Sequence, residues 1–225
     1  MTDRVTDRVR VVVHHARFAA TLARSIEAKL ADRVLVDVNV DEARDPPALA
    51  DADVLVGFRF PRGLGARMPK LRFVQLTGMG RDVVATLELD AHVRVDDIGD
   101  VHARAVAEHA MLALLLARSR GTAIGNVVVL GAGRVGSAIA TRARAFGWHT
   151  IGLARTTRER DGFAAVTTSL HALRQADAVV IALPLTPETR GLVDAEALAM
   201  LPRHAALVDI SRGGVVVEAE LGEAF

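Results

Sequence analysis

The stretch Val127-Val-Val-Leu-Gly-Ala-Gly-Arg-Val-Gly136 decides the fold of the second half of the chain. A β-branched run enters Gly-x-Gly-x-x-Gly directly, and the alanine-rich residues 138–145 continue as a predicted helix. Gly131 permits a tight strand-to-helix turn, Gly133 lets a diphosphate approach the backbone, and Gly136 lets the helix pack on the strand. The pattern predicts a dinucleotide site.

The same three glycines also fit an ordinary loop, because glycine is common and an isolated match to this motif is weak. The buried type of strand before the motif and the helical stretch after it favour the nucleotide site. In that interpretation the backbone amides of Arg134 and Val135 face the phosphates.

Apolar β-branched runs alternate with helical stretches along the rest of the chain, which is typical of βαβ units. The fold class is therefore α/β, with two open parallel-sheet domains at residues 1–100 and 101–225. The expected helices are 18–30 and 106–117. The expected strands are 9–13, 34–38, 54–57, 73–76, 93–95, 127–130, 150–153, 178–183 and 206–210. Strands of the second domain lack alternation, so both faces should be covered.

Composition excludes several classes of partner. Charged residues balance at 28 basic and 27 acidic without a block of one sign, which argues against a nucleic-acid or membrane surface. Residues 1–8 have no apolar signal core, and the longest apolar run, 110–117, is too short to span a bilayer. The chain has no cysteine, which fits a reducing compartment. We expect a cytoplasmic protein with a small-molecule ligand and no metal.

Several separated segments give the chain its family resemblance. They are Leu76-Thr-Gly-Met-Gly-Arg-Asp82, Gly99-Asp-Val-His-Ala-Arg-Ala-Val-Ala-Glu-His109, the Gly131 motif, and 177–192 with Leu207-Val-Asp-Ile-Ser-Arg-Gly-Gly214. In this order they resemble the D-isomer-specific 2-hydroxyacid dehydrogenases. The resemblance implies a flavodoxin-like substrate domain followed by a Rossmann domain that binds NAD(P).

The turn at Gly78-Met79-Gly80 offers backbone amides to an anion. The resemblance implies that the amides of Met79 and Gly80 hold the substrate carboxylate, and an ordinary strand-to-helix turn remains the alternative. Arg81 stands where relatives usually carry an aliphatic residue.

The end of the second Rossmann strand selects the cofactor, because an acidic residue there bonds the ribose hydroxyls and arginine accommodates a 2′-phosphate. Here Ala154 occupies the acidic position, and Arg155, Thr156 and Arg158 follow it. We therefore favour NADP over NAD. A solvated arginine-rich loop is the alternative, and both cofactors stay open.

The loop Leu183-Pro-Leu-Thr-Pro-Glu-Thr-Arg190 follows a predicted buried strand, and its prolines restrict the backbone. The resemblance implies that it brackets the nicotinamide-side ribose and phosphates. The cofactor contacts expected beyond the glycine motif and the basic loop are Leu183, Pro184, Thr189 and Ile210.

Arg212 carries the chemistry in this interpretation. A guanidinium is a planar, permanently charged donor that suits the carboxylate and carbonyl oxygens of a 2-oxo acid. The resemblance implies that Arg212 orients the substrate and polarises its carbonyl during hydride transfer, and a surface ion pair is the alternative. Asp209 stands where relatives usually carry asparagine.

Relatives complete the active site with a glutamate and then a histidine beyond the Arg-Gly motif, and Phe225 precedes both. We therefore expect a chain truncated at its carboxyl end relative to the family, with an incomplete Rossmann domain. His102 is the histidine best placed to replace the missing catalytic acid. The alternative is that it only packs or forms hydrogen bonds at this position. The segment between Arg118 and Asn126 is shorter than the relatives' dimerisation arm, so a homodimer and a monomer both stay open.

The expected function is reduction of a small 2-oxo acid, of the glyoxylate or hydroxypyruvate kind, to the D-2-hydroxy acid with NAD(P)H. The alternative is a non-catalytic NAD(P)-binding or regulatory remnant that has lost the acid–base pair. The glycine motif does not separate these two hypotheses.

Overall fold

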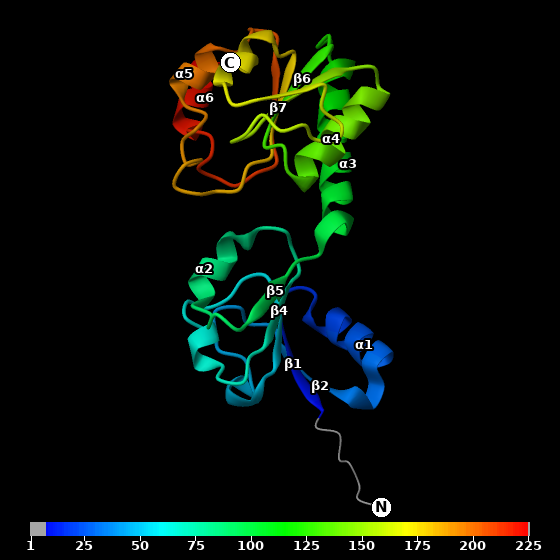
Figure 1. Cartoon of the computed structure of the whole chain (residues 1–225), viewed down its shortest axis with the longest axis vertical. Helices are drawn as coiled ribbons and strands as arrows, with labels where there is room; N and C mark the ends of the chain where they lie inside the picture. The colour runs from blue at the N-terminus through cyan, green and yellow to red at the C-terminus, as the bar shows by residue number, and fades with distance from the viewer. Residues whose placement is uncertain (1–7, 225) are drawn as a thin grey trace, which may run out of the picture. The chain divides into compact units, whose positions relative to one another are not determined.

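The computed structural model describes residues 8–224, and the chain divides into two compact units, Met1–Ile98 and Gly99–Phe225 (Figure 1). Residues 1–7, most of the segment without a signal core, lie outside the described residues. Each unit has its own parallel sheet and its own hydrophobic core. The expectation of an α/β fold with two open parallel sheets is confirmed.

The sheet of the first unit has five parallel strands in the order β2-β1-β3-β4-β5. This order is that of the flavodoxin-like fold, as expected. Its elements are β1 (Val9–His14), α1 (Ala19–Leu30), β2 (Val34–Asn39), β3 (Val54–Gly57), β4 (Phe73–Leu76), α2 (Val84–Leu87) and β5 (Arg94–Asp96).

Both faces of this first sheet are covered near its centre. Val11 and Val13 of β1 pack with Ala19 and Ala23 of α1 on one face. Alternate residues of the same strands point to the opposite face. There Val12, Leu55 and Leu76 pack against Leu64, Met68, Leu71 and Leu87.

The second sheet also has five parallel strands, in the order β10-β9-β6-β7-β8. If β6 is numbered 1 and the sheet is read from β8 to β10, this is the Rossmann order 3-2-1-4-5. Its elements are α3 (Gly99–Ser119), β6 (Asn126–Leu130), α4 (Arg134–Ala145), β7 (His149–Leu153), β8 (Ala165–Thr167), β9 (Ala178–Ile181), α5 (Ala195–Ala199), β10 (Ala206–Asp209) and α6 (Leu221–Ala224).

Helices cover both faces of the second sheet, which makes three layers (Figure 1). On one face Val127 and Val129 of β6 pack against Ala110 and Leu114 of α3 and Ile139 of α4. On the other face, Val128 and Leu130 pack with Leu173 and with Ala197 and Leu198 of α5. The two faces of β6 are therefore both apolar, which explains its unbroken valine run.

Three details differ from the expectation. Helix α3 begins at Gly99 rather than near residue 106, because Ala103 and Ala107 continue its buried face toward the amino end. Strand β10 is only half-buried and not covered like β6 and β9, because it lies at the edge of the sheet. Strand β8 was not predicted, since three residues paired only with β7 carry little periodicity.

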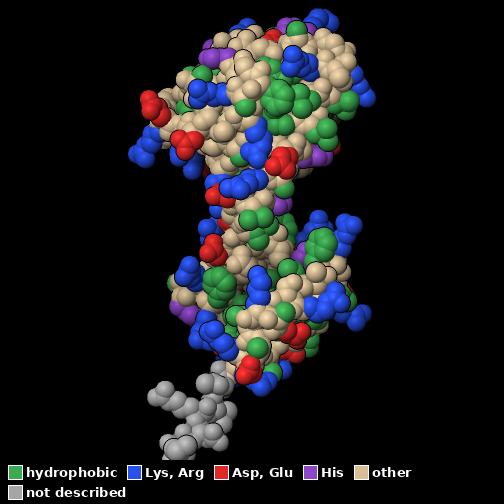
Figure 2. Space-filling model, turned by 90° about the vertical axis from the view of Figure 1, so that its right-hand side faces the viewer, with side chains coloured by type: hydrophobic (Ala, Val, Ile, Leu, Met, Phe, Trp, Pro, Cys, Tyr) green, Lys and Arg blue, Asp and Glu red, His purple; other side chains and the backbone are tan. Residues whose placement is uncertain are grey.

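Charge is mixed on the surface. Basic and acidic side chains are interspersed on the face that Figure 2 shows, in keeping with a net charge of +1. Along residues 8–224 none of the helices combines the length and the apolar character needed to cross a bilayer. The described residues also hold no group of three or more side chains suited to a metal ion.

Candidate functional site

The candidate site is the carboxyl edge of the second sheet, where strand order reverses between β6 and β9. The strand ends are aligned there: Gly131 N–H donates to Leu153 O over 2.9 Å, and Ala182 N–H donates to Leu130 O over 2.8 Å. Ligands of open α/β sheets bind outside the carboxyl ends of the strands at such a switch point. The glycine turn and the loops after β7 and β9 therefore lie side by side.

The three glycines at this turn differ in what an added Cβ atom would meet. Gly131 has a φ of +110°, and a Cβ there would approach Ala182 O to 2.6 Å. A Cβ at Gly136 would collide with the carbonyl oxygen of Gly131. At Gly133, by contrast, a Cβ would meet nothing within 4 Å. The space beside Gly133 is open to a ligand.

The start of helix α4 gives this turn a positive electrostatic potential. It begins at Arg134, directly after Gly133, and runs for 12 residues. Its first amide groups have no partners within the helix, and its dipole favours negative charge at this end. The open backbone at Gly133 and the helix start together fit a dinucleotide diphosphate, which the amides of Arg134 and Val135 would hold.

The residues expected to select the cofactor follow β7 at the same edge. Ala154 is half-buried, whereas Arg155 and Thr156 are exposed. No acidic residue stands at the position next to the strand, so the first charged group that a ligand meets after β7 is a guanidinium.

The loop after β9 is held by one hydroxyl. Thr189 Oγ1 donates to Pro184 O over 2.6 Å and accepts from the Thr186 N–H over 2.8 Å. Leu183 and Thr189 are half-buried, and Pro184 is exposed. The loop therefore presents a rigid backbone beside the glycine turn.

Glu188 was not assigned a role from the sequence. Hydrogen bonds from the Thr186 side chain and from its own N–H lower the pKa of the Glu188 carboxyl; burial opposes them, and the charge of Arg155 makes only the smallest contribution. A signal was present, since this acid lies in a loop predicted to share a sheet edge with the basic residues after β7.

Arg212 is positioned by a turn after β10. Ile210 N–H donates to Ile181 O over 3.1 Å, so the segment leaves the sheet beside β9. Asp209 Oδ1 then accepts from the Ser211 N–H over 2.8 Å and from the Ser211 hydroxyl over 2.6 Å. This local ring of hydrogen bonds fixes the turn. Arg212 itself is half-buried, and its Nη1 donates to Ser211 O over 2.9 Å.

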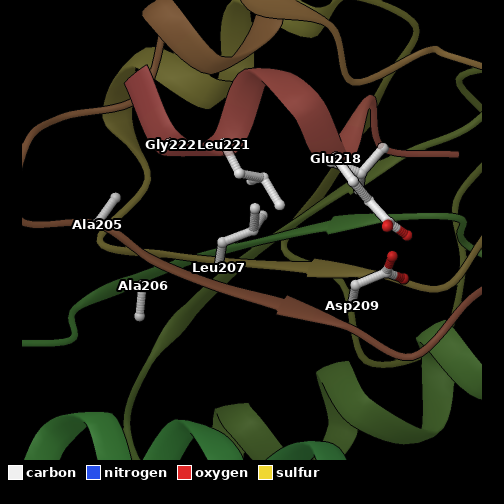
Figure 3. A pocket seen from close by; sticks show the side chains of 8 residues that line it. Ala205, Ala206, Leu207, Asp209, Glu218, Leu221 and Gly222 are labelled. Atoms are coloured by element: carbon white, nitrogen blue, oxygen red, sulfur yellow. The ribbon is translucent and has the colours of Figure 1, made fainter. Parts of the chain in front are cut away.

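A separate groove of about 700 Å³ follows the outer edge of β10 (Figure 3). Leu207 and Leu221 line it with apolar side chains, and the carboxylates of Asp209 and Glu218 face one another at one end. Strand β9 separates β10 from β6, so this groove is distinct from the glycine turn.

Met79 and Gly80 lie in the first unit, immediately after β4. Both are half-buried and follow the carboxyl end of β4. Arg81 is exposed, and its Nη2 donates to Val95 O over 3.1 Å, so this guanidinium binds backbone at the end of β5.

Two histidines require comment. His102 lies near the start of α3 and is half-buried. His14 ends β1, one residue beyond the expected strand, and is completely buried. It stacks on Phe60 with ring centroids 5.7 Å apart and accepts at Nδ1 from Asn39 over 2.9 Å. Burial lowers the pKa of His14, against the opposing effects of Glu42, Asp41 and Asp45.

A family model described as the NAD binding domain of D-isomer specific 2-hydroxyacid dehydrogenase matches residues 101–225, more than half of the chain. The chain belongs to this family. The matched range contains the glycine turn, the loops after β7 and β9, and Arg212, so the candidate site lies within the part of the chain that matches the family's NAD binding domain.

Curated relatives agree with the family assignment. A D-3-phosphoglycerate dehydrogenase of Mycobacterium leprae is 34% identical over 92% of this chain, and the match spans 45% of the relative. A glyoxylate reductase of Pyrococcus horikoshii is 30% identical over 83% of this chain and 68% of the relative. This chain thus spans about half the length of the phosphoglycerate dehydrogenases that it matches.

Solved structures of the family share the fold. A D-isomer specific 2-hydroxyacid dehydrogenase from Xanthobacter autotrophicus, in complex with NADPH and MES, is 28% identical with a TM-score of 0.81, covering 96% of this chain and 76% of that one. A glyoxylate/hydroxypyruvate reductase from Sinorhizobium meliloti with NADP and sulfate is 26% identical with a TM-score of 0.80, covering 96% and 77%.

Proposed function

We propose that this chain binds NADP(H) at the edge formed by the ends of β6, β7 and β9. The observation that carries this proposal is the open backbone at Gly133, at the start of α4 and at the switch point of a Rossmann sheet. Such a turn accepts a diphosphate without a collision. The residues that would hold the cofactor are Gly131, Gly133, Arg134, Val135, Gly136, Arg155, Thr156, Leu183, Pro184, Thr189 and Ile210.

The preference for NADP(H) over NAD(H) rests on Arg155. A guanidinium binds phosphate with two parallel hydrogen bonds, and Thr156 adds a hydroxyl beside it. The acid that would bond the ribose hydroxyls of NAD is replaced by Ala154. The NADPH and NADP complexes of the two structural relatives support this assignment.

The reaction that we propose is reduction of a small 2-oxo acid, of the glyoxylate or hydroxypyruvate class, to its D-2-hydroxy acid. The nicotinamide supplies or accepts the hydride when the cofactor is bound. Arg212 binds the substrate carboxylate and polarises the carbonyl oxygen, on which negative charge develops. The amides of Met79 and Gly80 donate to the carboxylate. Relatives named glyoxylate reductase support this substrate class.

The test combines cofactor binding with turnover. Titration with NADPH and NADH measures association, and the loss of NADPH absorbance with glyoxylate or hydroxypyruvate measures reduction. Oxidation of D-3-phosphoglycerate is measured with both oxidised cofactors, because some relatives carry that name. Turnover of D-3-phosphoglycerate alone would reject the small-acid class. NADPH binding without turnover of any acid would contradict hydride transfer and leave a nucleotide-binding protein.

Arg212→Ala separates the substrate role from folding. We expect it to keep NADPH affinity and to lower kcat/KM by about 100-fold or more, the usual cost of removing one electrostatic donor to the reacting oxygen. Arg203→Ala is the matched control, because Arg203 is an exposed arginine in the loop before β10 of the same unit. Equal losses in the two variants would refute the assigned role.

A further inference from the structure

The Gly78-Met79-Gly80 turn leaves the first sheet beside the end of β3. Strand β4 pairs with β3 on one side and with β5 on the other. The Thr77 N–H donates to Gly57 O over 2.8 Å, so the pairing of β3 with β4 continues past the last residue of β4. Phe58, the first residue after β3, therefore lies next to the turn.

The Phe58 ring packs directly on the backbone of Gly78. A Cβ atom added at Gly78 would lie 2.5 Å from Cε2 and 2.8 Å from Cδ2 of that ring, whereas carbon atoms in contact are normally about 3.5–4.0 Å apart. Gly78 is not among the glycines with a positive φ, so its backbone does not need a glycine for a left-handed conformation. The contact with the ring therefore accounts for the glycine at this position.

Arg81 holds the turn from its other side. Its Nη2 donates to Val95 O over 3.1 Å, in β5. Met79 and Gly80 lie between these two contacts, and within residues 8–224 neither backbone N–H donates a hydrogen bond to another group of the chain. Two donors are thus available to a ligand in a turn that is held at both ends.

We propose that Phe58 is a positioning residue, whose ring on Gly78 holds the amides of Met79 and Gly80 in the geometry that binds the substrate carboxylate. This inference rests on the proposed assignment of those amides to the carboxylate. Donors that are already in place bind an anion without a further cost of ordering the chain, whereas a loop that must first become ordered binds it more weakly. Loss of the ring should therefore weaken the binding of substrate and not that of the cofactor.

The first test is Phe58→Ala. We expect the KM for glyoxylate to rise about threefold to tenfold, with kcat and the Kd for NADPH within about twofold of wild type, because the carboxylate contacts are the same before and during hydride transfer. Phe58→Tyr keeps the ring and should keep the wild-type KM. Phe73→Ala is the matched control, because Phe73 is also a half-buried phenylalanine of this unit but stands at the opposite end of β4 and faces Arg94. A rise of the same size in the control would overturn the proposal.

The second test does not need turnover. Relaxation of the Met79 and Gly80 amides, measured by NMR on the full chain, reports the rigidity of the turn. The order parameters of both amides should fall in Phe58→Ala and stay at the wild-type level in Phe58→Tyr. Unchanged order parameters in Phe58→Ala would refute the positioning role.

Titration with oxalate, an unreactive analogue of glyoxylate, separates this inference from the assignment on which it rests. If oxalate shifts both amide resonances equally well in wild type and in Phe58→Ala, the carboxylate assignment stands and the inference fails. If oxalate shifts neither resonance in wild type, both fail. We expect a shift in wild type that needs several times more oxalate in Phe58→Ala.

A double variant checks the contact itself. Gly78→Ala places a methyl group against the ring and should lower the temperature of thermal unfolding. Because the ring is gone in Phe58→Ala, the double variant should lose less than the sum of the two single losses, as residues in contact do. Additive losses would show that the ring does not lie on Gly78 and would contradict the proposal.

Discussion

At the scale of single residues, the three motif glycines have separable roles. Gly133→Ala places a methyl group in open space at a φ of −87°, which alanine adopts freely. We expect its stability to stay within about 0.5 kcal/mol of wild type. Its NADPH affinity should fall about tenfold or more, because the methyl group occupies the space that a diphosphate needs.

Gly136→Ala provides the contrast. Its Cβ would collide with the carbonyl oxygen of Gly131, so the turn and the start of α4 must shift. We expect a loss of about 2 kcal/mol of stability, as for overpacking in a rigid core. Thermal unfolding without cofactor, followed by circular dichroism, compares the two variants. Equal losses of stability would show that the turn does not have the geometry described.

At the scale of elements, Asp177 joins the amino ends of three strands. Its Oδ2 accepts from the N–H groups of Gly125 and Asn126 over 2.8 and 2.7 Å, where β6 begins. Its Oδ1 accepts from the His204 ring over 3.0 Å, just before β10. The carboxylate therefore connects β6, β9 and β10 at the edge opposite the candidate site.

The protonation of Asp177 should govern acid stability at this edge. Burial raises its pKa, but the hydrogen bonds from His204, Asn126 and Gly125 outweigh burial and lower it overall. A lowered pKa in the folded state means that the stabilisation is full above the unfolded value of about 3.9 and is lost as pH falls through the folded value.

Asp177→Asn should therefore cost about 2 kcal/mol near neutral pH, because an amide cannot accept all of these bonds. The cost should shrink below about pH 4, as the pH falls toward the lowered pKa of the folded carboxyl. Urea unfolding between neutral pH and the acid range measures both effects. The exposed Asp161 supplies the control Asp161→Asn, and a cost independent of pH would contradict the proposed role of charge.

At the scale of the whole molecule, the two units have separate cores. Leu55 belongs to a cluster formed within the first unit, and Val129 to one within the second. A ligand stabilises the structure that binds it, by about 2.7 kcal/mol at a free concentration of 100 times Kd. Because all proposed cofactor contacts are in the second unit, NADPH should slow amide exchange in β6 far more than in β3. Hydrogen exchange followed by mass spectrometry measures this, and equal protection of both strands would contradict it.

Much of this architecture was readable in local patterns. The valine run 127–130 and the glycines after it predict a strand, a tight turn and a helix, because backbone sterics act between neighbouring residues. The alternation of apolar β-branched runs with helical stretches predicts βαβ units and therefore two parallel sheets. The basic residues after Ala154 are likewise visible without coordinates.

Other features arise from residues that only the folded chain brings together. Asp177 meets the Gly125 amide across 52 positions of sequence, and the Arg142 guanidinium meets Glu108 across 34. Strand β8 exists because β7 offers it an edge, and half-burial of β10 follows from its place in the sheet order. Composition and periodicity carry no record of such pairings, since strand order and hydrogen bonding between distant segments are set when the core packs.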